Sequence, residues 1–364
     1  MLVLTEQVDL AAFTTLGLGG PAARVARADT ADDVVAGVRE ADLAGEPVLV
    51  MGGGSNLVIA DTGFPGTVVR VATTGVALSE TEGGVIVTVA AGENWDRLVE
   101  WAVGEKLSGI ECLAGIPGLA GATPIQNVGA YGQEVARAIT AVRVFDRDVS
   151  EVLTLDALSC GFGYRTSLFK RTPLRPGETG PTGRYVVLDV TFSLARDPMS
   201  APVRYAELAT RLGIAVGDQA PLADVREAVL GLRRGKGMVL DPGDPDTASV
   251  GSFFTNPVLD QDHFNELERV ADAAFPGVRV PRFEADGGQL KVPAAWLIEH
   301  AGFGKGYRGP GGASISSKHT LALTNHDGAT TADLIGLASQ VAAGVRSTFG
   351  VELTNEPVLV GVEL

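Results

Sequence analysis

A strand that runs directly into three glycines constrains the fold of this chain more than any other feature. The apolar run Pro-Val-Leu-Val at 47–50 is typical of a short buried strand, and Gly-Gly-Gly-Ser-Asn follows at 52–56. No helical pattern comes next, because residues 67–71 indicate another strand. Successive glycine N–H groups can point in one direction and bind an anion. The residues that we expect to do so here, with two side-chain donors among them, are Gly52, Gly53, Gly54, Ser55 and Asn56.

The common glycine-rich nucleotide motifs do not fit this sequence. Residues 17–22, Gly-Leu-Gly-Gly-Pro-Ala, have the spacing of a dinucleotide fingerprint, but no apolar strand precedes them and Pro21 interrupts them. We interpret this segment as a turn into an edge strand. Gly235-Lys236 and Gly304-Lys305 lack the upstream glycine and the following hydroxyl of a P-loop. The sequence therefore favours neither a Rossmann domain nor a P-loop NTPase.

A second glycine-rich segment at 114–132 has neither helical nor strand periodicity. Its glycines and two prolines predict a long ordered loop. We expect this loop to lie against the other side of a flat or diphosphate-bearing cofactor held by the glycines at 52–54.

Apolar periodicity places the remaining elements, and a composition shift at 196–203 predicts a domain boundary. Thr30 and Asp33 indicate a capping box, and Asn94 indicates a helix N-cap. Helices are predicted at 30–41, 94–102, 204–212, 221–233, 260–275, 293–301 and 330–349, and further strands at 84–92, 186–194 and 351–364.

Length and charge limit the function classes. The 364 residues exceed one ordinary domain of roughly 100–200 residues. The net charge of −15 argues against nucleic acid as a partner, because phosphate backbones are bound by clustered Lys and Arg. There is no basic leader and no apolar stretch of about 18 residues, so we expect a cytoplasmic protein with no membrane partner.

Cysteine and histidine spacing predicts no metal site and no disulfide framework. Cys112 and Cys160 are interpreted as small core residues. No G-x-S-x-G occurs, so a serine hydrolase is not supported. Three polar residues in unusual settings remain, and each is either functional or a capping or paired residue: Arg165, Ser252 and Glu356.

Five motifs, taken in order, resemble one known family. They are GGGSN at 52–56, GIPGLAGATPIQNVGAYGQE at 115–134, GYRTSLFK at 163–170, GSFFTNP at 251–257 and LTNEP at 353–357. Together they resemble the UDP-N-acetylenolpyruvoylglucosamine reductases, flavin enzymes of bacterial cell-wall precursor synthesis. The segment VRYAEL at 203–208 is similar to the type I subgroup, in which an extra loop closes over the substrate.

The resemblance implies an α+β fold. A two-lobed FAD-binding domain of the PCMH/VAO type would span 1–195, with lobes at about 1–70 and 71–195. A smaller α+β substrate-binding domain would span 203–350, and the strand at 351–364 would return to the flavin domain. FAD would be non-covalent, since no histidine precedes His263, and we expect a monomer. Besides residues 52–56, the implied FAD contacts are Gly115, Gly118, Gly121, Ala122, Ile125 and Gly129.

The resemblance also implies a reaction. NADPH would reduce FAD, and flavin N5 would pass a hydride to the methylene carbon of the enolpyruvyl ether of UDP-N-acetylglucosamine, giving UDP-N-acetylmuramate. Arg165 and Glu356 would orient and stabilise the enolic intermediate, and Ser252 would donate the proton. Glu356 could polarise the intermediate only if it is protonated, which its apolar flanks would favour. The implied substrate contacts, mainly to the diphosphate, are Tyr131, Tyr205, Lys236 and Asn256.

Two alternatives stay open at this point. Another flavoenzyme of the same FAD fold, such as an alcohol or sugar oxidase, would share the glycine loops. A catalytically inactive protein that binds nucleotide sugars would need no combination of Arg165, Ser252 and Glu356.

Overall fold

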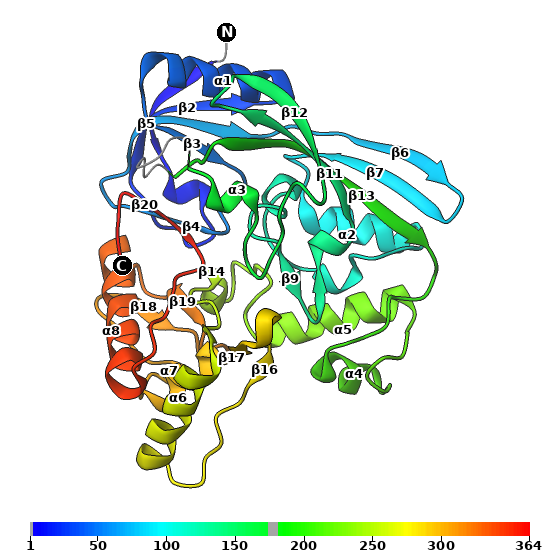
Figure 1. Ribbon diagram of the computed structural model, residues 1–364. Coiled ribbons are helices and arrows are strands. Elements are labelled where there is room, and N and C mark those ends of the chain that lie inside the picture. The colour runs from blue at the N-terminus through cyan, green and yellow to red at the C-terminus, as the bar shows by residue number, and fades with distance from the viewer. Residues whose placement is uncertain (1–2, 174–180) are drawn as a thin grey trace. The chain divides into compact units, whose positions relative to one another are not determined.

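The computed structural model describes residues 3–173 and 181–364 (Figure 1). The chain forms two compact units. The first comprises Met1–Asp9, Pro21–Gly54 and Phe64–Val239, and the second comprises Leu10–Gly20, Ser55–Gly63 and Leu240–Leu364. This division differs from the predicted boundary at 196–203. Residues 203–230 contribute apolar side chains to the same core as the strands of the first unit, which is why they belong with it.

A four-stranded sheet in the first unit carries the first glycine loop. Its order is β1 (Leu4–Asp9), β2 (Pro21–Ala28), β5 (Phe64–Val71) and β3 (Val48–Met51), with β2, β5 and β3 parallel. Helix α1 (Ala31–Ala44) contacts β2, β3 and β5, and it begins at the predicted capping box. The predicted edge position of β2 is wrong, because β1 pairs with its other side.

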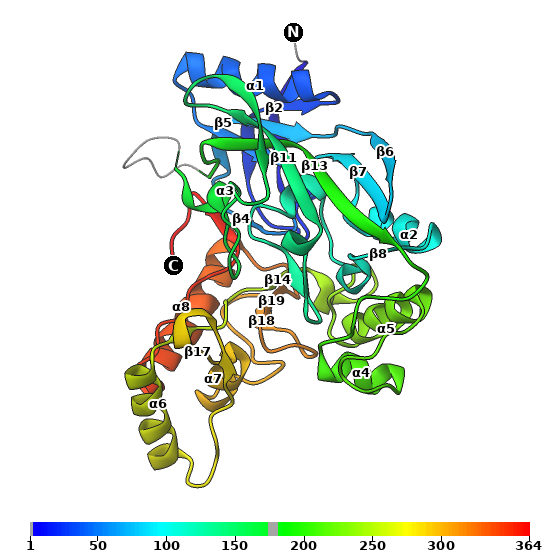
Figure 2. The same cartoon turned by 45° about the vertical axis from the view of Figure 1, so that its right-hand side comes forward.

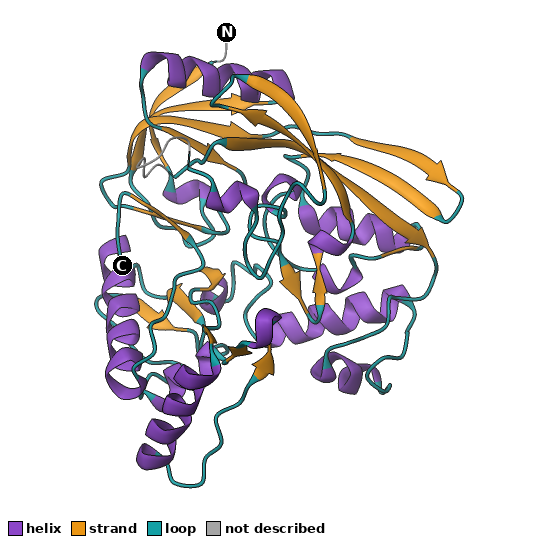
Figure 3. Ribbon diagram, in the orientation of Figure 1, coloured by secondary structure: helices purple, strands orange, loops and turns teal. Residues whose placement is uncertain are grey.

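A larger antiparallel sheet also belongs to the first unit (Figure 3). Its order is β12 (Glu151–Asp156), β11 (Ile139–Asp146), β13 (Tyr185–Arg196), β7 (Gly84–Ala90) and β6 (Val76–Thr81), and β8 (Leu107–Ser108) also pairs with β13. The strands predicted at 84–92 and 186–194 are confirmed. Along β13 the expected inward side chains are buried, namely Val186, Leu188, Val190, Phe192 and Leu194.

Besides α1, three longer helices belong to the first unit. Helix α2 (Trp95–Gly104) starts at Asn94, whose side chain accepts from Arg97 N as predicted. Helices α4 (Ala206–Leu212) and α5 (Leu222–Gly235) contact each other, as Figure 2 also shows. Shorter elements are α3 (Leu168–Arg171) and the hairpin of β9 (Gly129–Ala130) and β10 (Gln133–Glu134).

The second unit has three small sheets and three helices. The sheets are β14 (Ser249–Ser252), β19 (Ala322–Asn325) and β18 (Ala313–Ile315); β15 (Val258–Leu259), β17 (Leu290–Lys291) and β16 (Phe283–Glu284); and β20 (Val358–Val360) with β4 (Leu57–Ile59). The helices are α6 (Gln261–Ala274), α7 (Ala294–His300) and α8 (Thr331–Phe349), and all three were predicted.

The terminal segment is less regular than predicted. A strand was expected over 351–364, but only Val358–Val360 is one, between Pro357 and Gly361, which has φ 71°. This strand pairs in parallel with β4, which belongs to the second unit as well.

Neither cysteine is poised for chemistry. Burial raises the pKa of Cys160 to about 11 and also raises the pKa of Cys112 well above its usual range. Within residues 3–173 and 181–364, no cluster of three potential metal ligands occurs and no helix is long and apolar enough to span a membrane.

Candidate functional site

The two glycine-rich loops lie against each other in the first unit. A Cβ added at Gly53 would stand 3.1 Å from the Cα of Gly118, and one at Gly52 would stand 3.3 Å from Leu119 Cδ1. The backbones approach so closely that a larger residue at position 53 would push the loops apart. Gly54 has φ 62°, a left-handed conformation that favours glycine.

The start of α2 fastens the second loop. Trp95 N donates to Gly118 O at 3.1 Å, and Asp96 Oδ1 accepts from Gly115 N at 2.7 Å. Gly121 N donates to Ala91 O at 2.9 Å, and a Cβ at Gly121 would lie only 2.4 Å from Ala91 Cβ. These glycines are therefore needed for close packing, whereas the neighbouring Ala122 and Ile125 are exposed.

Two arginines beside this loop retain donors for a ligand. Of the buried side-chain nitrogens and oxygens in the described part of the chain, the Nε atoms of Arg226 and Arg233 have no hydrogen-bond partner. Arg233 Nη2 donates to Met238 O at 2.8 Å, and burial lowers the pKa of Arg233 to about 10. A buried guanidinium with a donor to spare, next to a cradle of glycine backbone, fits an anionic, diphosphate-bearing cofactor such as FAD.

Arg165 lies beside the end of the second loop. It has φ 51°, its Nη2 donates to Gly129 O at 2.8 Å, and its guanidinium lies over the ring of Tyr164 at 5.8 Å. Asn127, which is buried and ties these segments together, was not predicted from the sequence. Its Nδ2 donates to Gly163 O and to Glu134 Oε2, both at 3.1 Å. Its place in an aperiodic loop was the only available signal.

Three of the predicted substrate contacts come together in the first unit. The rings of Tyr131 and Tyr205 pack edge to face with centroids 5.5 Å apart, and Lys236 Nζ lies 5.6 Å from the Tyr131 ring centre. Burial, partly offset by Arg233, raises the pKa of Tyr131 to about 12, so its hydroxyl stays a donor. Glu207, which the sequence analysis did not single out, pairs with Lys236 at 2.7 Å.

A backbone ladder in the second unit brings Ser252 and Glu356 together. Glu356 N donates to Phe253 O at 2.8 Å, Phe254 bridges Asn355, and Thr255 N donates to Thr354 O at 3.0 Å. The chain enters this ladder through Gly251, which has φ 76°. Phe253 and Phe254 are fully buried and anchor it. Two of the three predicted catalytic residues are therefore neighbours.

The other predicted residues in this unit have structural contacts. Asn256 Oδ1 accepts from Ala294 N at 2.9 Å, at the start of α7. Ser55 and Asn56 also belong to the second unit, and Asn56 O accepts from Val358 N at 2.9 Å. The side-chain oxygen of Asn256 is thus engaged with the helix, which leaves its amide nitrogen for a ligand.

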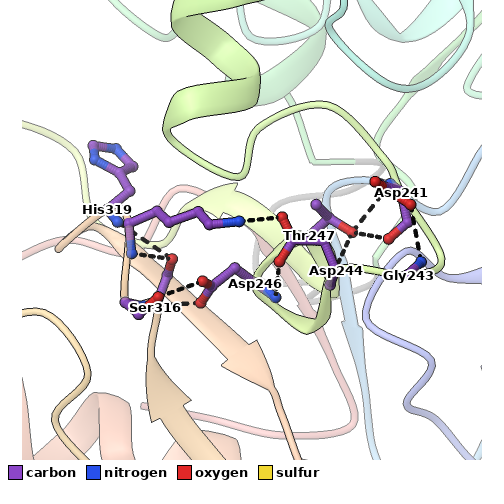
Figure 4. A network of polar contacts seen from close by, with 9 residues as sticks. Asp241, Gly243, Asp244, Asp246, Thr247, Ser316 and His319 are labelled. Atoms are coloured by element: carbon purple, nitrogen blue, oxygen red, sulfur yellow. Dashed lines mark hydrogen bonds and ion pairs between the residues drawn. The ribbon is translucent and has the colours of Figure 1, made fainter.

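A partly buried polar network holds the strand that carries Ser252 (Figure 4). Asp246 Oδ1 and Oδ2 accept from the N and Oγ of Ser317, at 2.8 and 2.6 Å, while Lys318 pairs with Asp244. Ser317 and Lys318 lie in the turn at 316–321, and their partners Asp246 and Asp244 precede β14. The same turn also contacts the residues at the end of β14, since Phe253 N donates to Leu321 O at 2.7 Å and Ser252 pairs with Ala322. The turn at 316–321 is thereby tied to both ends of β14.

Comparisons with known proteins identify the family. The sequence model for the C-terminal domain of UDP-N-acetylenolpyruvoylglucosamine reductase matches residues 244–360, and that for an FAD binding domain matches residues 22–156. A UDP-N-acetylenolpyruvoylglucosamine reductase of Thermobifida fusca is 55% identical over 361 residues, which cover 99% of this chain and 98% of that protein. One from Salinispora arenicola is 56% identical and covers 98% of this chain and 96% of its own. The chain belongs to the UDP-N-acetylenolpyruvoylglucosamine reductase family.

The family assignment confirms the fold class and the cofactor. The chain is an FAD-dependent oxidoreductase with an α+β fold. The crystal structure of the UDP-N-acetylenolpyruvylglucosamine reductase of Thermus caldophilus superposes with a TM-score of 0.62 over 99% of both chains, at 24% identity. The resemblance stated from the five motifs is thus confirmed for this family.

Proposed function

We propose that this reductase uses NADPH to convert UDP-N-acetylglucosamine enolpyruvate to UDP-N-acetylmuramate, a step of peptidoglycan precursor synthesis, as a monomer in the cytoplasm. Family membership supports the reaction class. The observation that carries the proposal is the hydrogen bond from Glu356 N to Phe253 O at 2.8 Å, which brings a carboxyl group and the hydroxyl of Ser252 onto adjacent chain segments.

The residues would act on charge and protons. FAD, when bound, would supply a hydride, taken from NADPH, to the methylene carbon of the enolpyruvyl ether. Negative charge would then develop at the adjacent carbon and its carboxylate. Arg165 offers a fixed guanidinium fork for that carboxylate, and Glu356 in its protonated form would donate to it. Ser252 would give the proton that completes the saturated product.

The substrate would be held by its diphosphate. At a net charge of −15 the chain repels a nucleotide diphosphate at long range, so affinity depends on a few local groups. We assign this role to Tyr205, Lys236 and Asn256, and we place Tyr131 near the flavin and the substrate. FAD would contact the glycine loops, through Gly52, Gly53, Gly54, Ser55, Asn56, Gly115, Gly118, Gly121, Ala122, Ile125 and Gly129.

A two-step assay tests the proposed reaction. The purified protein is first reduced with NADPH without oxygen, and UDP-N-acetylglucosamine enolpyruvate is then added. We expect stoichiometric reoxidation of the flavin with formation of UDP-N-acetylmuramate. Reoxidation by oxygen with a free alcohol or sugar as reductant, and none by the enolpyruvyl substrate, would instead identify an oxidase.

The attachment of the flavin is a separate prediction. No histidine precedes His263 in the sequence, and both cysteines are buried, so we expect FAD to be held without a covalent bond. Acid precipitation of the yellow protein should release all flavin into the supernatant. Flavin retained in the washed pellet would contradict the prediction.

A further inference from the structure

The ammonium group of Lys236 is attracted by two neighbours, the carboxylate of Glu207 and the aromatic ring of Tyr131. Its Nζ lies 2.7 Å from Glu207 Oε2 and 5.6 Å from the ring centre of Tyr131. The aromatic face attracts the cation without neutralising it, whereas the carboxylate neutralises it. A ligand phosphate that binds Lys236 must therefore meet the charge of Glu207 at the same atom.

Tyr131, Tyr205, Glu207 and Lys236 form a cluster, here called the Tyr131 cluster, that is assembled from three separate chain segments. Tyr131 has φ 48° in the β9–β10 turn, and a Cβ at the following Gly132 would lie 3.2 Å from Arg204 Cβ, so this turn sits directly on the segment before Tyr205. Glu207 lies in the first turn of α4, and Lys236 is the residue after α5. The contact between Lys236 and Glu207 therefore forms only when these segments are folded together, unlike an ion pair between residues three or four apart on one helix.

We infer that Glu207 sets the affinity and charge selectivity of the diphosphate site, by occupying Lys236 until a more highly charged ligand displaces it. This inference rests on the proposed function. A diphosphate with two negative charges exceeds the charge of one carboxylate, whereas a singly charged anion only equals it. Glu207 therefore disfavours weakly charged anions and raises the KM of the substrate at the same time.

The expected magnitude follows from exposure. The side chains of Lys236 and Glu207 are 32% and 42% exposed. Ion pairs that are this exposed are weak, and losing one changes a binding constant by at most about fivefold. Replacing Glu207 by the neutral isostere should lower the KM by about two- to fivefold. Because the charges are partly exposed, the difference should shrink as salt is added.

The test compares Glu207→Gln with Glu227→Gln. Glu227 makes an ion pair with Arg234 at 3.2 Å on α5, without contact to the Tyr131 cluster, so its replacement changes net charge equally. KM for the enolpyruvyl substrate and the inhibition constant of UDP, as a non-reacting probe, are measured at low and high salt. We expect both constants to fall in Glu207→Gln only, with the change in KM rather than kcat.

A double variant identifies Lys236 as the mediator. In a Lys236→Ala background, the gain from Glu207→Gln should disappear, because the carboxylate then has no cation to occupy. An unchanged or raised KM in Glu207→Gln would overturn the inference. An equal fall of KM in Glu227→Gln would overturn it as well, because the effect would then come from the net charge of the protein and not from the contact with Lys236. Failure of the proposed function would be seen separately, as no turnover of the substrate by the unmodified protein.

Discussion

The two compact units place their own candidate functional residues by different means. In the first unit, Tyr131, Tyr205 and Lys236 are placed by contacts between side chains, and Tyr205 is 42% exposed. In the second unit, Ser252 and Glu356 are placed by backbone hydrogen bonds. Side-chain contacts can rearrange at low energetic cost, whereas a ladder anchored in a core cannot.

The difference matches the two tasks that we assign. A proton donor must lie within hydrogen-bond distance of one carbon, so a rigid strand suits Ser252. A diphosphate site must open and close around a charged ligand, so partly exposed side chains suit it. Tyr131, Tyr205 and Lys236 should therefore control KM, and Ser252 and Glu356 should control the chemical step.

Removing the Ser252 hydroxyl is the strongest test of this comparison. In Ser252→Ala we expect reoxidation of the flavin by the enolpyruvyl substrate to slow by about 10²–10⁴-fold, the usual range for general acid catalysis, while reduction by NADPH stays nearly intact. Stopped-flow absorbance of the two half-reactions measures both rates.

Thr255→Val is the matched control for that experiment. Its hydroxyl bonds to Thr354 O at 3.3 Å on the same ladder, so its loss tests structure without the proposed acid. Equal slowing of both half-reactions in Ser252→Ala would show that the serine maintains the fold around the flavin and is not the proton donor.

Removing the Tyr205 hydroxyl tests the first unit. A hydrogen bond to a charged phosphate contributes about 1.5–3 kcal/mol, so Tyr205→Phe should raise the KM of the UDP-sugar about ten- to a hundredfold. Because the contact is remote from the reacting carbons, kcat should fall much less. Steady-state kinetics of Tyr205→Phe and of Lys236→Ala measure the effect.

Tyr185→Phe is a suitable control, since Tyr185 lies at the start of β13 and packs on Phe169 of α3. If KM stayed unchanged in both Tyr205→Phe and Lys236→Ala, the diphosphate site would have to be sought elsewhere. The side-chain contacts of Tyr131, Tyr205 and Lys236 would then have no demonstrated role in binding, and their comparison with the rigid Ser252 strand would fail.

Local signals explain which parts of the fold the sequence could predict. Helix α8 carries a capping box at Thr330 and Asp333 and ends at Gly350 with φ 69°, so neighbours in sequence define its limits. The position of β2 inside its sheet depends on β1, and the extent of the first unit depends on how α4 and α5 pack. Pairings between segments that are distant in the sequence produce no periodic pattern in either segment, so they could not be predicted from the sequence.

The candidate site shows the same division. Ser252 and Glu356 stood out because their neighbours are glycine, aromatic or apolar residues. Glu207, Asn127 and Arg233 belong to no local sequence pattern that marks a functional site, and only the fold gives them their partners. Residues that act through a contact across the chain could not be found from local pattern.

The smallest expected effect concerns the network that holds β14. Burial by itself raises the pKa of Asp246, but hydrogen bonds from Ser317 and Ser316 and the charge of Lys318 outweigh it and leave this pKa below its usual value. A lowered folded-state pKa stabilises the fold above the unfolded-state pKa of about 4, and this contribution is lost as the pH falls through the folded-state value. Asp246→Asn should therefore lower the unfolding free energy by about 1 kcal/mol at neutral pH and make this free energy decline less steeply below about pH 4.

Asp327→Asn is the control, because Asp327 bonds to Arg308 on the surface, where its pKa is also lowered. Denaturant titrations between acid and neutral pH measure both. An equal loss in the two variants would mean that the turn at 316–321 does not brace the Ser252 strand, and that the second unit is rigid through its backbone ladder alone.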